Sequence, residues 1–277
     1  MSAEKFMRIL LTNDDGITSP GITLLAGALR NAGHRVIIAA PDRNRSGSSH
    51  SIAFLDEPVK IKEIEKDTWS CSGTPVDCVI IALLGGVPDI DITTPYENNL
   101  NLEKAPDVIL SGINLGANLG TDLNYSGTAA AARQGSFFGI PSIALSLIDN
   151  DMGIYHWEPI LSYITEKLPE FMSFWKSGSF ININFPNNGK KPAALVPTFP
   201  SIRYYNDRIE RYTAPDGNIY CFAKTGKVGK QPAEGSDWAE VLKNNAALSV
   251  VRSEPVSRGE PRTYGSTSDH LPVVRLG

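Results

Sequence analysis

The sequence lacks an excess of positive charge, a long apolar run and any paired arrangement of cysteines. Its 277 residues hold 26 Lys and Arg against 30 Asp and Glu, which gives a formal net charge of −4. Proteins that bind nucleic acid through its phosphates normally carry a basic excess, so we expect no nucleic-acid partner. The longest apolar stretch, residues 79–87, is far shorter than the ~20 residues of a membrane helix, so we expect no membrane association.

The three cysteines, Cys71, Cys78 and Cys221, are an odd number, and none has the CxxC spacing of a metal-ligand pair. We expect Cys71 and Cys78 to be buried structural thiols because both lie in apolar surroundings. No targeting segment stands out, so a reducing, cytoplasmic location is the simplest interpretation. Hydrophobic residues make up 42% of the chain and charged residues 20%, as in an ordinary globular protein.

The first part of the chain alternates short apolar runs with segments of helical spacing, which predicts an α/β fold with a parallel sheet. The predicted strands are uniformly apolar, as buried parallel strands are. Strands are expected at residues 8–12, 35–40, 68–71, 107–111, 142–147 and 180–184, and helices at 22–31, 74–84, 128–138 and 158–174.

The composition changes after about residue 185, where Pro, Gly, Asn and Lys become frequent. Pro215, Asp216 and Gly217 form a turn signal within an aromatic-rich stretch at 212–222, which predicts a hairpin. A short helix at 236–244 and a strand at 247–251 are also expected. We therefore divide the chain into an α/β catalytic core (1–185) and a β-rich C-terminal extension (186–277) that serves as an oligomerisation arm.

Oxygen-bearing side chains follow three of the predicted strands. These are Asp14 and Asp15 after the strand at 8–12, Ser46 after the strand at 35–40 and Asn114 after the strand at 107–111. Ligands of open parallel sheets bind beyond the carboxyl ends of the strands, and oxygen donors suit Mg²⁺ or Mn²⁺. A lone Asp-Asp-Gly is more often a polar turn, but its coincidence with the other two strand ends favours one divalent metal ion.

Small and hydroxyl-bearing residues precede the Ala-rich helix predicted at 128–138. A helix start offers free N–H groups to an anion, so this segment is a candidate phosphate site, although Ser126 and Thr128 could simply cap the helix. We expect phosphate or substrate contacts from Asn118, Ser126, Gly127 and Thr128, together with Asn13 and Gly47 in the neighbouring loops. No Walker A or GxGxxG pattern is present, so no organic cofactor is indicated.

Six stretches, taken together and in order, resemble the SurE family of survival proteins, which are metal-dependent 5'-nucleotidases. Several long motifs in the same order make the resemblance specific, and it covers most of residues 7–147. The matching stretches are 8–16 (RILLTNDDG), 20–22 (PGI), 40–47 (APDRNRSG), 73–78 (GTPVDC), 111–120 (SGINLGANLG) and 125–131 (YSGTAAA).

The resemblance implies a Rossmann-like core and a metal ion held by Asp14, Asp15, Ser46 and Asn114. It also implies homodimers or homotetramers built by exchanged C-terminal segments, and substrates that include 5'- and 3'-mononucleotides and, in some members, polyphosphate. Two stretches depart from the family pattern: an apparent insertion at 88–105, and Ser253-Glu254-Pro255 in place of Thr-Pro-Leu. These departures affect the oligomer contacts and a C-terminal loop facing the substrate rather than the metal site.

The resulting hypothesis is hydrolysis of phosphomonoesters, with Asp14 or Asp15 as a metal ligand, a base or a nucleophile. The alternative is a non-catalytic nucleotide-binding module on the same fold. A dehalogenase-type phosphatase would need Asp-x-Asp, but Gly16 stands two residues after Asp14. A two-domain glycosyltransferase would need a second α/β domain, and a receiver module would need an Asp where Ser111 ends its strand.

Overall fold

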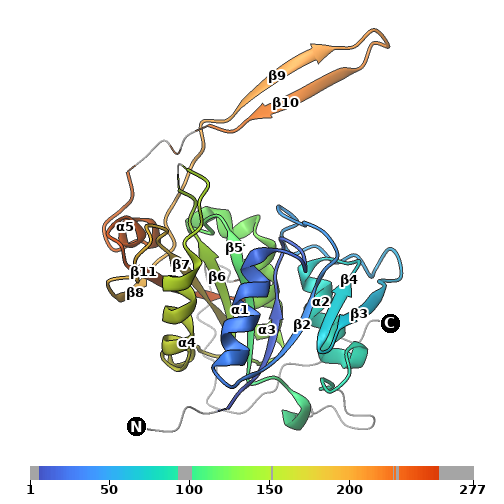
Figure 1. Ribbon diagram of the computed structural model, residues 1–277. Coiled ribbons are helices and arrows are strands. Elements are labelled where there is room, and N and C mark those ends of the chain that lie inside the picture. Colours follow the sequence, from blue (N-terminus) through green and yellow to red (C-terminus); the bar gives the residue numbers. More distant parts are fainter. Residues whose placement is uncertain (1–5, 93–101, 151, 227, 229–230, 256–277) are drawn as a thin grey trace.

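A mostly parallel nine-stranded sheet forms the body of the protein. The computed structural model describes residues 6–92, 102–150, 152–226, 228 and 231–255, and Figure 1 shows their arrangement. The sheet has the order β3-β4-β2-β1-β5-β6-β7-β11-β8, which confirms the predicted α/β class. Its strands are β1 (Arg8–Thr12), β2 (Arg35–Pro41), β3 (Ile61–Glu65), β4 (Thr68–Cys71), β5 (Val108–Leu115), β6 (Ser142–Leu147), β7 (Ser179–Phe185), β8 (Leu195–Thr198) and β11 (Ala246–Arg252).

Helices cover both faces of this sheet (Figure 1). Alternate side chains of β1 enter different cores: Ile9 and Leu11 belong to the larger apolar cluster, which includes residues of α1 and α4, and Leu10 to a second cluster with residues of α2. This alternation follows from the two-residue period of a strand. The helices are α1 (Pro20–Asn31), α2 (Pro75–Ile81), α3 (Gly127–Phe137), α4 (Trp157–Ser173) and α5 (Asp237–Leu242).

The helix expected at 74–84 begins at Pro75, with Thr74 as its N-cap, and ends at Ile81, earlier than expected. Thr74 and Asp77 form a reciprocal capping box, in which the Asp77 amide donates to Thr74 Oγ1 (3.2 Å) and the Thr74 amide donates to Asp77 Oδ2 (2.8 Å). After Ile81 the chain continues as a π-turn (η1, Ala82–Gly86), because Gly85 adopts a φ of +86°. Two short 3₁₀ turns, η2 (Leu102–Lys104) and η3 (Gly120–Asn124), occur later.

The sheet differs from the sequence expectation at its edges and in the direction of three strands, β3, β8 and β11. β3 and β8 were not expected, because β3 is almost entirely exposed and β8 contains Pro197. β3 and β11 run antiparallel to β4 and β7, so the sheet is not wholly parallel. β5 extends to Leu115, which places Asn114 inside the strand rather than after it.

The predicted hairpin forms and projects from the body as a separate two-stranded arm, β9 (Arg208–Thr213) and β10 (Ile219–Lys224) (Figure 1). β8 and β11, by contrast, complete the main sheet although both follow residue 185. The division of the chain at 185 therefore stays a prediction. Of the 88–105 insertion, residues 93–101 lie outside the described part of the chain.

Among the helices that the structure describes, none combines the length and apolar character needed to cross a bilayer. Cys71 and Cys78 are buried free thiols, as expected, while Cys221 is exposed on the arm.

Two glycines of α1 should respond oppositely to alanine. A Cβ at Gly21 would lie 2.0 Å from the Ile113 carbonyl oxygen, whereas a Cβ at Gly27 would meet nothing within 4 Å. We expect Gly21→Ala to lower the free energy of unfolding by about 2–3 kcal/mol, because β5 backbone must move. Gly27→Ala should raise it by up to ~1 kcal/mol through helix propensity. Urea unfolding measures both, and equal effects of the two variants would contradict the close packing of α1 on β5.

Candidate functional site

Asp14 lies directly after β1, where its carboxylate meets the start of α3. The Thr128 hydroxyl donates to Asp14 Oδ1, and the side chain is only 4% exposed. Burial raises the pKa of Asp14, and hydrogen bonds from the Thr128 side chain and from the backbone of Thr128 and Gly127 oppose that rise. The anion at this helix start is therefore the Asp14 carboxylate itself, as expected for exposed N–H groups and a positive dipole end.

Gly127 permits this approach because it has no side chain. A Cβ at Gly127 would lie 2.8 Å from Asp14 Cβ and 2.9 Å from Ser48 Oγ. Ser126 caps α3 by accepting a hydrogen bond from the Ala129 amide (3.0 Å), which leaves its own hydroxyl proton for another acceptor. Ser126, Gly127 and Thr128 are thus brought to Asp14 as a group.

Asp15 is less buried than Asp14 and makes a different contact. Its Oδ2 accepts a hydrogen bond from the Leu115 amide at the end of β5 (3.1 Å). Burial raises the pKa of Asp15 to about 6, and the negative charges of Asp14 and Asp149 add to the rise. Two adjacent carboxylates held this way favour a cation between them.

Asn114 and Gly116 flank Leu115, whose amide binds Asp15, and Gly116 lies against Asp149. The Asn114 Nδ2 group donates to the Gly116 carbonyl (2.9 Å), which orients the amide so that Oδ1 is available to a ligand. Gly116 has a φ of +115°, and a Cβ there would lie 3.2 Å from Asp149 Oδ2. Asp149 in turn accepts a hydrogen bond from the Tyr155 hydroxyl.

The loop after β2 carries Ser46 and is tied to both Asp14 and the segment before α3. The Arg45 amide donates to the Asp14 carbonyl (2.7 Å). The Ser49 amide donates to the Tyr125 carbonyl (3.1 Å), and the Ser49 hydroxyl donates to the Asn124 carbonyl (2.7 Å). Ser46 is exposed on this loop.

Two arginines, Arg43 and Arg45, precede Ser46 in this loop. The Arg45 guanidinium donates to the Ser72 carbonyl, so it holds the loop against the residue that follows β4. Arg43 is exposed and lies 3.6 Å from Asp42, an arrangement typical of a solvated surface pair.

The residues present fit a hard divalent cation. Asp14, Asp15, Ser46 and Asn114 offer carboxylate, hydroxyl and amide oxygens, the donors that Mg²⁺ and Mn²⁺ prefer. Among the described residues, Asn13 Oδ1 and Ser48 Oγ are buried without a hydrogen-bond partner, and Ser48 faces Asp14 across Gly127. No cluster of three His, Cys, Asp or Glu that could hold a metal occurs in the described ranges, so a metal here would depend on the hydroxyl and amide donors.

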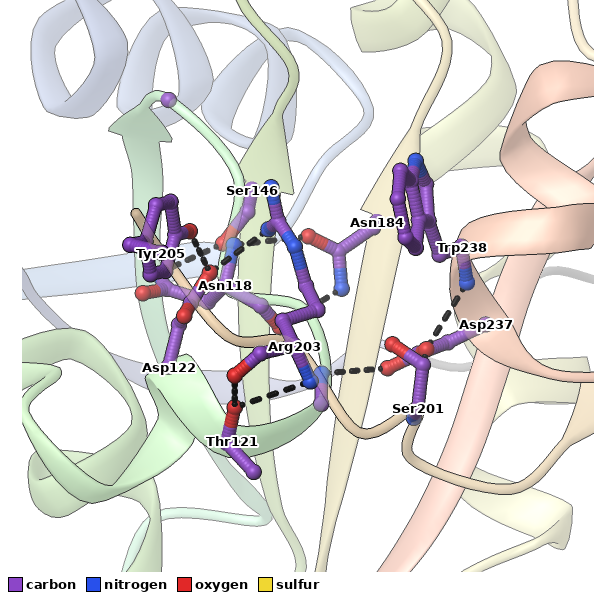
Figure 2. Close-up of polar contacts among 12 residues, drawn as sticks. Asn118, Thr121, Asp122, Ser146, Asn184, Ser201, Arg203, Tyr205, Asp237 and Trp238 are labelled. Atoms are coloured by element: carbon purple, nitrogen blue, oxygen red, sulfur yellow. Dashed lines mark hydrogen bonds and ion pairs between the residues drawn. The ribbon is translucent and has the colours of Figure 1, made fainter. Parts of the chain in front are cut away.

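Asn118 follows β5 and is held by several hydrogen bonds, those to Ser146 and Asn184 among them (Figure 2). Its amide donates to Asn184 Oδ1 (2.9 Å) and its Nδ2 group to Ser146 Oγ (2.9 Å). Its carbonyl accepts from the side chains of Asn182 (2.9 Å) and Asn184 (3.0 Å). Only the Asn118 Oδ1 atom is left for a substrate, so these contacts favour a role in shaping the loop.

Ser48, Asp149 and Tyr155 were missed from the sequence. Ser48 had a signal, since the loop carries three serines at 46, 48 and 49, and only packing shows which one faces Asp14. Asp149 and Tyr155 follow β6, a strand end to which the strand-end argument was not applied. His50 follows the three serines of this loop; its Nε2 lies 2.9 Å from Gln134 Oε1, and burial lowers its pKa.

The raised pKa of Asp15 predicts that the metal-free protein loses free energy of unfolding as the pH rises. The folded state holds the Asp15 proton more tightly than the unfolded state, where the pKa is about 3.9, so its stabilising contribution is full below pH 4 and is lost as pH rises through about 6. Relative to wild type, Asp15→Asn should gain about 1–2 kcal/mol of unfolding free energy between pH 4 and pH 7, after allowance for partial exposure.

Urea unfolding in chelator at several pH values measures this difference, with the exposed Asp56→Asn as control. A difference between Asp15→Asn and wild type that stays constant with pH would contradict the assigned environment.

Two relatives found by comparison with known proteins carry the same name. A 5'-nucleotidase SurE of Xanthomonas campestris pv. campestris (strain B100) is 40% identical over 182 residues, or 65% of this chain and 64% of that protein. A 5'-nucleotidase SurE of Xylella fastidiosa (strain M12) is 49% identical over 142 residues, or 51% of this chain and 48% of that protein. The aligned segments thus span less than two thirds of these relatives' own lengths.

Structural comparison extends the likeness along more of the chain. The crystal structure of SurE protein from Aquifex aeolicus superposes with a TM-score of 0.74 at 32% identity, covering 90% of this chain and 94% of that one. The family described as survival protein SurE matches residues 9–206, a range that contains all the site residues above. The chain belongs to the SurE family.

Proposed function

We propose that this protein is a metal-dependent phosphomonoesterase that hydrolyses nucleoside 5'-monophosphates to nucleoside and phosphate. Nucleoside 3'-monophosphates and polyphosphate are further candidate substrates. The observation that carries the proposal is the contact of Asp14 with the start of α3, next to Asp15 at the end of β5, which gathers anionic metal ligands and phosphate-binding donors at one edge of the sheet. The relatives named 5'-nucleotidase support the choice of substrate.

One Mg²⁺ or Mn²⁺ ion per subunit would be held by Asp14, Asp15, Ser46 and Asn114. When bound, such an ion supplies Lewis-acid polarisation of a phosphate oxygen and a lowered pKa of bound water. The loop contact from the Arg45 amide to the Asp14 carbonyl supports placing Ser46 with the acidic pair.

The two aspartates differ in what they can do. Asp14 Oδ1 accepts a hydrogen bond from Thr128, and backbone groups at the start of α3 also bind this carboxylate, so its orientation is fixed, which suits a metal ligand. Asp15 uses Oδ2 for one backbone contact and is less buried than Asp14, so its Oδ1 atom is free to meet a water molecule. We therefore assign proton acceptance from the attacking water to Asp15 Oδ1.

Donors around Asp14 would hold the phosphate. The Ser48 hydroxyl lies next to Gly127 and Asp14, and we assign the free hydroxyl proton of Ser126 and the backbone of Gly47 to the same phosphate. Asn13 closes the site near β1, where its Nδ2 group donates to the Gly16 carbonyl (2.9 Å). Donors fixed in this way stabilise charge on a transferring phosphoryl group.

The arm supports a homodimer or homotetramer as the functional assembly. A two-stranded ribbon is at best marginally stable alone, yet β9 and β10 expose large side chains, including Tyr212, Tyr220 and Phe222. Cross-strand pairing places these three on one face, where Tyr212 and Phe222 meet edge to face at 5.5 Å. We also propose a cytoplasmic setting, since the three cysteines are free.

Phosphate release should require a divalent metal and both aspartates. We expect the purified protein to release phosphate from 5'-AMP with Mg²⁺ or Mn²⁺, to lose this activity in chelator and to regain it when metal returns. Asp14→Asn and Asp15→Asn should each reduce kcat by at least ~10²-fold, because each removes a metal ligand or the base. Colorimetric phosphate assays measure this across 5'- and 3'-mononucleotides and an aryl phosphate.

The matched control is Asp56→Asn, an exposed aspartate away from the site, which should keep full activity. Nucleotide binding without turnover, measured by equilibrium dialysis on folded protein, would instead favour the non-catalytic module. Full activity of both aspartate variants would remove the assignment of the site.

Polar residues on the aromatic face of the arm should break the assembly. We expect the double substitution Tyr212→Ser and Phe222→Ser to shift the protein toward monomers, whereas Arg211→Ser on the opposite face should not. Light scattering coupled to size-exclusion chromatography gives the mass of each species. A wild-type monomer, or an unchanged mass in the double variant, would contradict the role of this face.

A further inference from the structure

Residues 201–205 lead to the arm and form its root. They cross the loop between β5 and α3 (Figure 2). The Thr121 hydroxyl donates to the Arg203 carbonyl (2.7 Å) and accepts from the Arg203 amide (3.2 Å). The contact is close, because a Cβ at Gly120 would lie only 1.9 Å from the Ser201 carbonyl oxygen. The root of the arm therefore rests directly on η3.

The Arg203 side chain fixes the middle of η3 through Asp122. Its Nη1 lies 2.6 Å from Asp122 Oδ2, and the two side chains are only 13% and 18% exposed. The guanidinium carbon lies 5.4 Å from the Tyr205 ring centroid and 5.3 Å from that of Trp238. The Tyr205 hydroxyl also donates to Asp122 Oδ2 (2.7 Å). Such a planar, stacked and paired arrangement is one that lysine cannot reproduce.

A second anchor holds the start of the same turn. Asp237, wholly buried at the start of α5, accepts hydrogen bonds from the Gly120 amide (2.7 Å) and the Ser201 amide (2.9 Å). Asp237 thus fixes where η3 begins, while Arg203 and Tyr205 fix Asp122 two residues later. Removing the Arg203 contact would release the later part of the turn without detaching its start.

The later part of η3 is the part that touches the catalytic site. The Asn124 and Tyr125 carbonyls accept hydrogen bonds from Ser49, in the loop that carries Ser46. Ser126, the next residue, caps α3, whose Thr128 holds Asp14. A shift of η3 would therefore move a proposed metal ligand and the proposed phosphate site together.

We propose that Arg203 is a positioning residue for catalysis, which acts through Asp122 and η3 to hold the Ser46 loop and the start of α3 in their working geometry. Arg203 belongs to the root of the arm, so the arm and the catalytic site share this contact. The inference rests on the proposed function for its kinetic readout. The inference also predicts changes in the Mn²⁺ dissociation constant and in amide hydrogen exchange, and neither measurement needs catalysis.

The test compares Arg203→Lys with Arg211→Lys, an exposed arginine on the arm that serves as the matched control. We expect Arg203→Lys to lower kcat/KM for 5'-AMP about 10-fold, since small displacements of catalytic groups cost rate steeply. The KM should rise more than kcat falls, because the displaced groups bind metal and phosphate. The Mn²⁺ dissociation constant, measured by titration without substrate, should rise at least about 5-fold by the same argument.

Asp122→Asn and the double variant complete a mutant cycle. If the two residues act as one pair, the double variant should be no worse than Arg203→Lys alone. Tyr205→Phe, which removes only the hydroxyl on Asp122, should cause a smaller effect in the same direction and serves if Arg203→Lys fails to fold. Rates for Arg203→Lys equal to those of Arg211→Lys, or fully additive effects, would overturn the proposal.

Amide hydrogen exchange separates this result from failure of the proposed function. Arg203→Lys should speed exchange at 121–128 and 45–49 even if the wild-type protein hydrolyses no nucleotide and binds no Mn²⁺. Unchanged exchange in both segments would overturn the positioning role on its own. A wild-type protein without phosphatase activity but with the expected exchange and Mn²⁺ changes would leave the positioning role standing.

Discussion

The structure depends on holding a buried carboxylate against a helix start. Asp14 is almost fully buried, and a charge in that position is costly unless it is hydrogen-bonded. The start of α3 supplies those bonds, and Gly127 allows the helix to come close enough to form them. These hydrogen bonds require β1, the loop after β2 and the segment before α3 to meet at one point. Asp15 lies at the same point.

Much of this arrangement could be predicted from the sequence, because it depends on local patterns. The apolar runs at β1, β2, β5 and β6 are each followed by polar residues, and the strand-end rule then groups Asp14, Asp15 and Asn114 without any coordinates. The hairpin turn around Gly217 and the capping box at Thr74 and Asp77 are also local signals. Edge strands such as β3 lack the apolar run that marks a buried strand, so they gave no signal.

The remainder of the site depends on contacts between distant segments, which no local pattern shows. Asn182 and Asn184 interrupt an apolar strand, but their role appears only when β7 is seen to hold the Asn118 carbonyl. Arg203 follows a loop with no helical or strand period, and its partner Asp122 is far away in the sequence. Ser48 and Ser46 look alike in the sequence, and burial against Gly127 distinguishes them.

The position of β11 has a consequence for the order in which the protein can be made. β11 lies between β7 and β8, yet it leaves the ribosome after both of them and after the arm. Until it emerges, β7 offers an unpaired inner edge and β8 has no neighbour in the main sheet, and an open edge invites pairing with another chain. The arm root and α5 must therefore be synthesised before the sheet can close, which makes a nascent chain stalled inside the arm a species prone to aggregation.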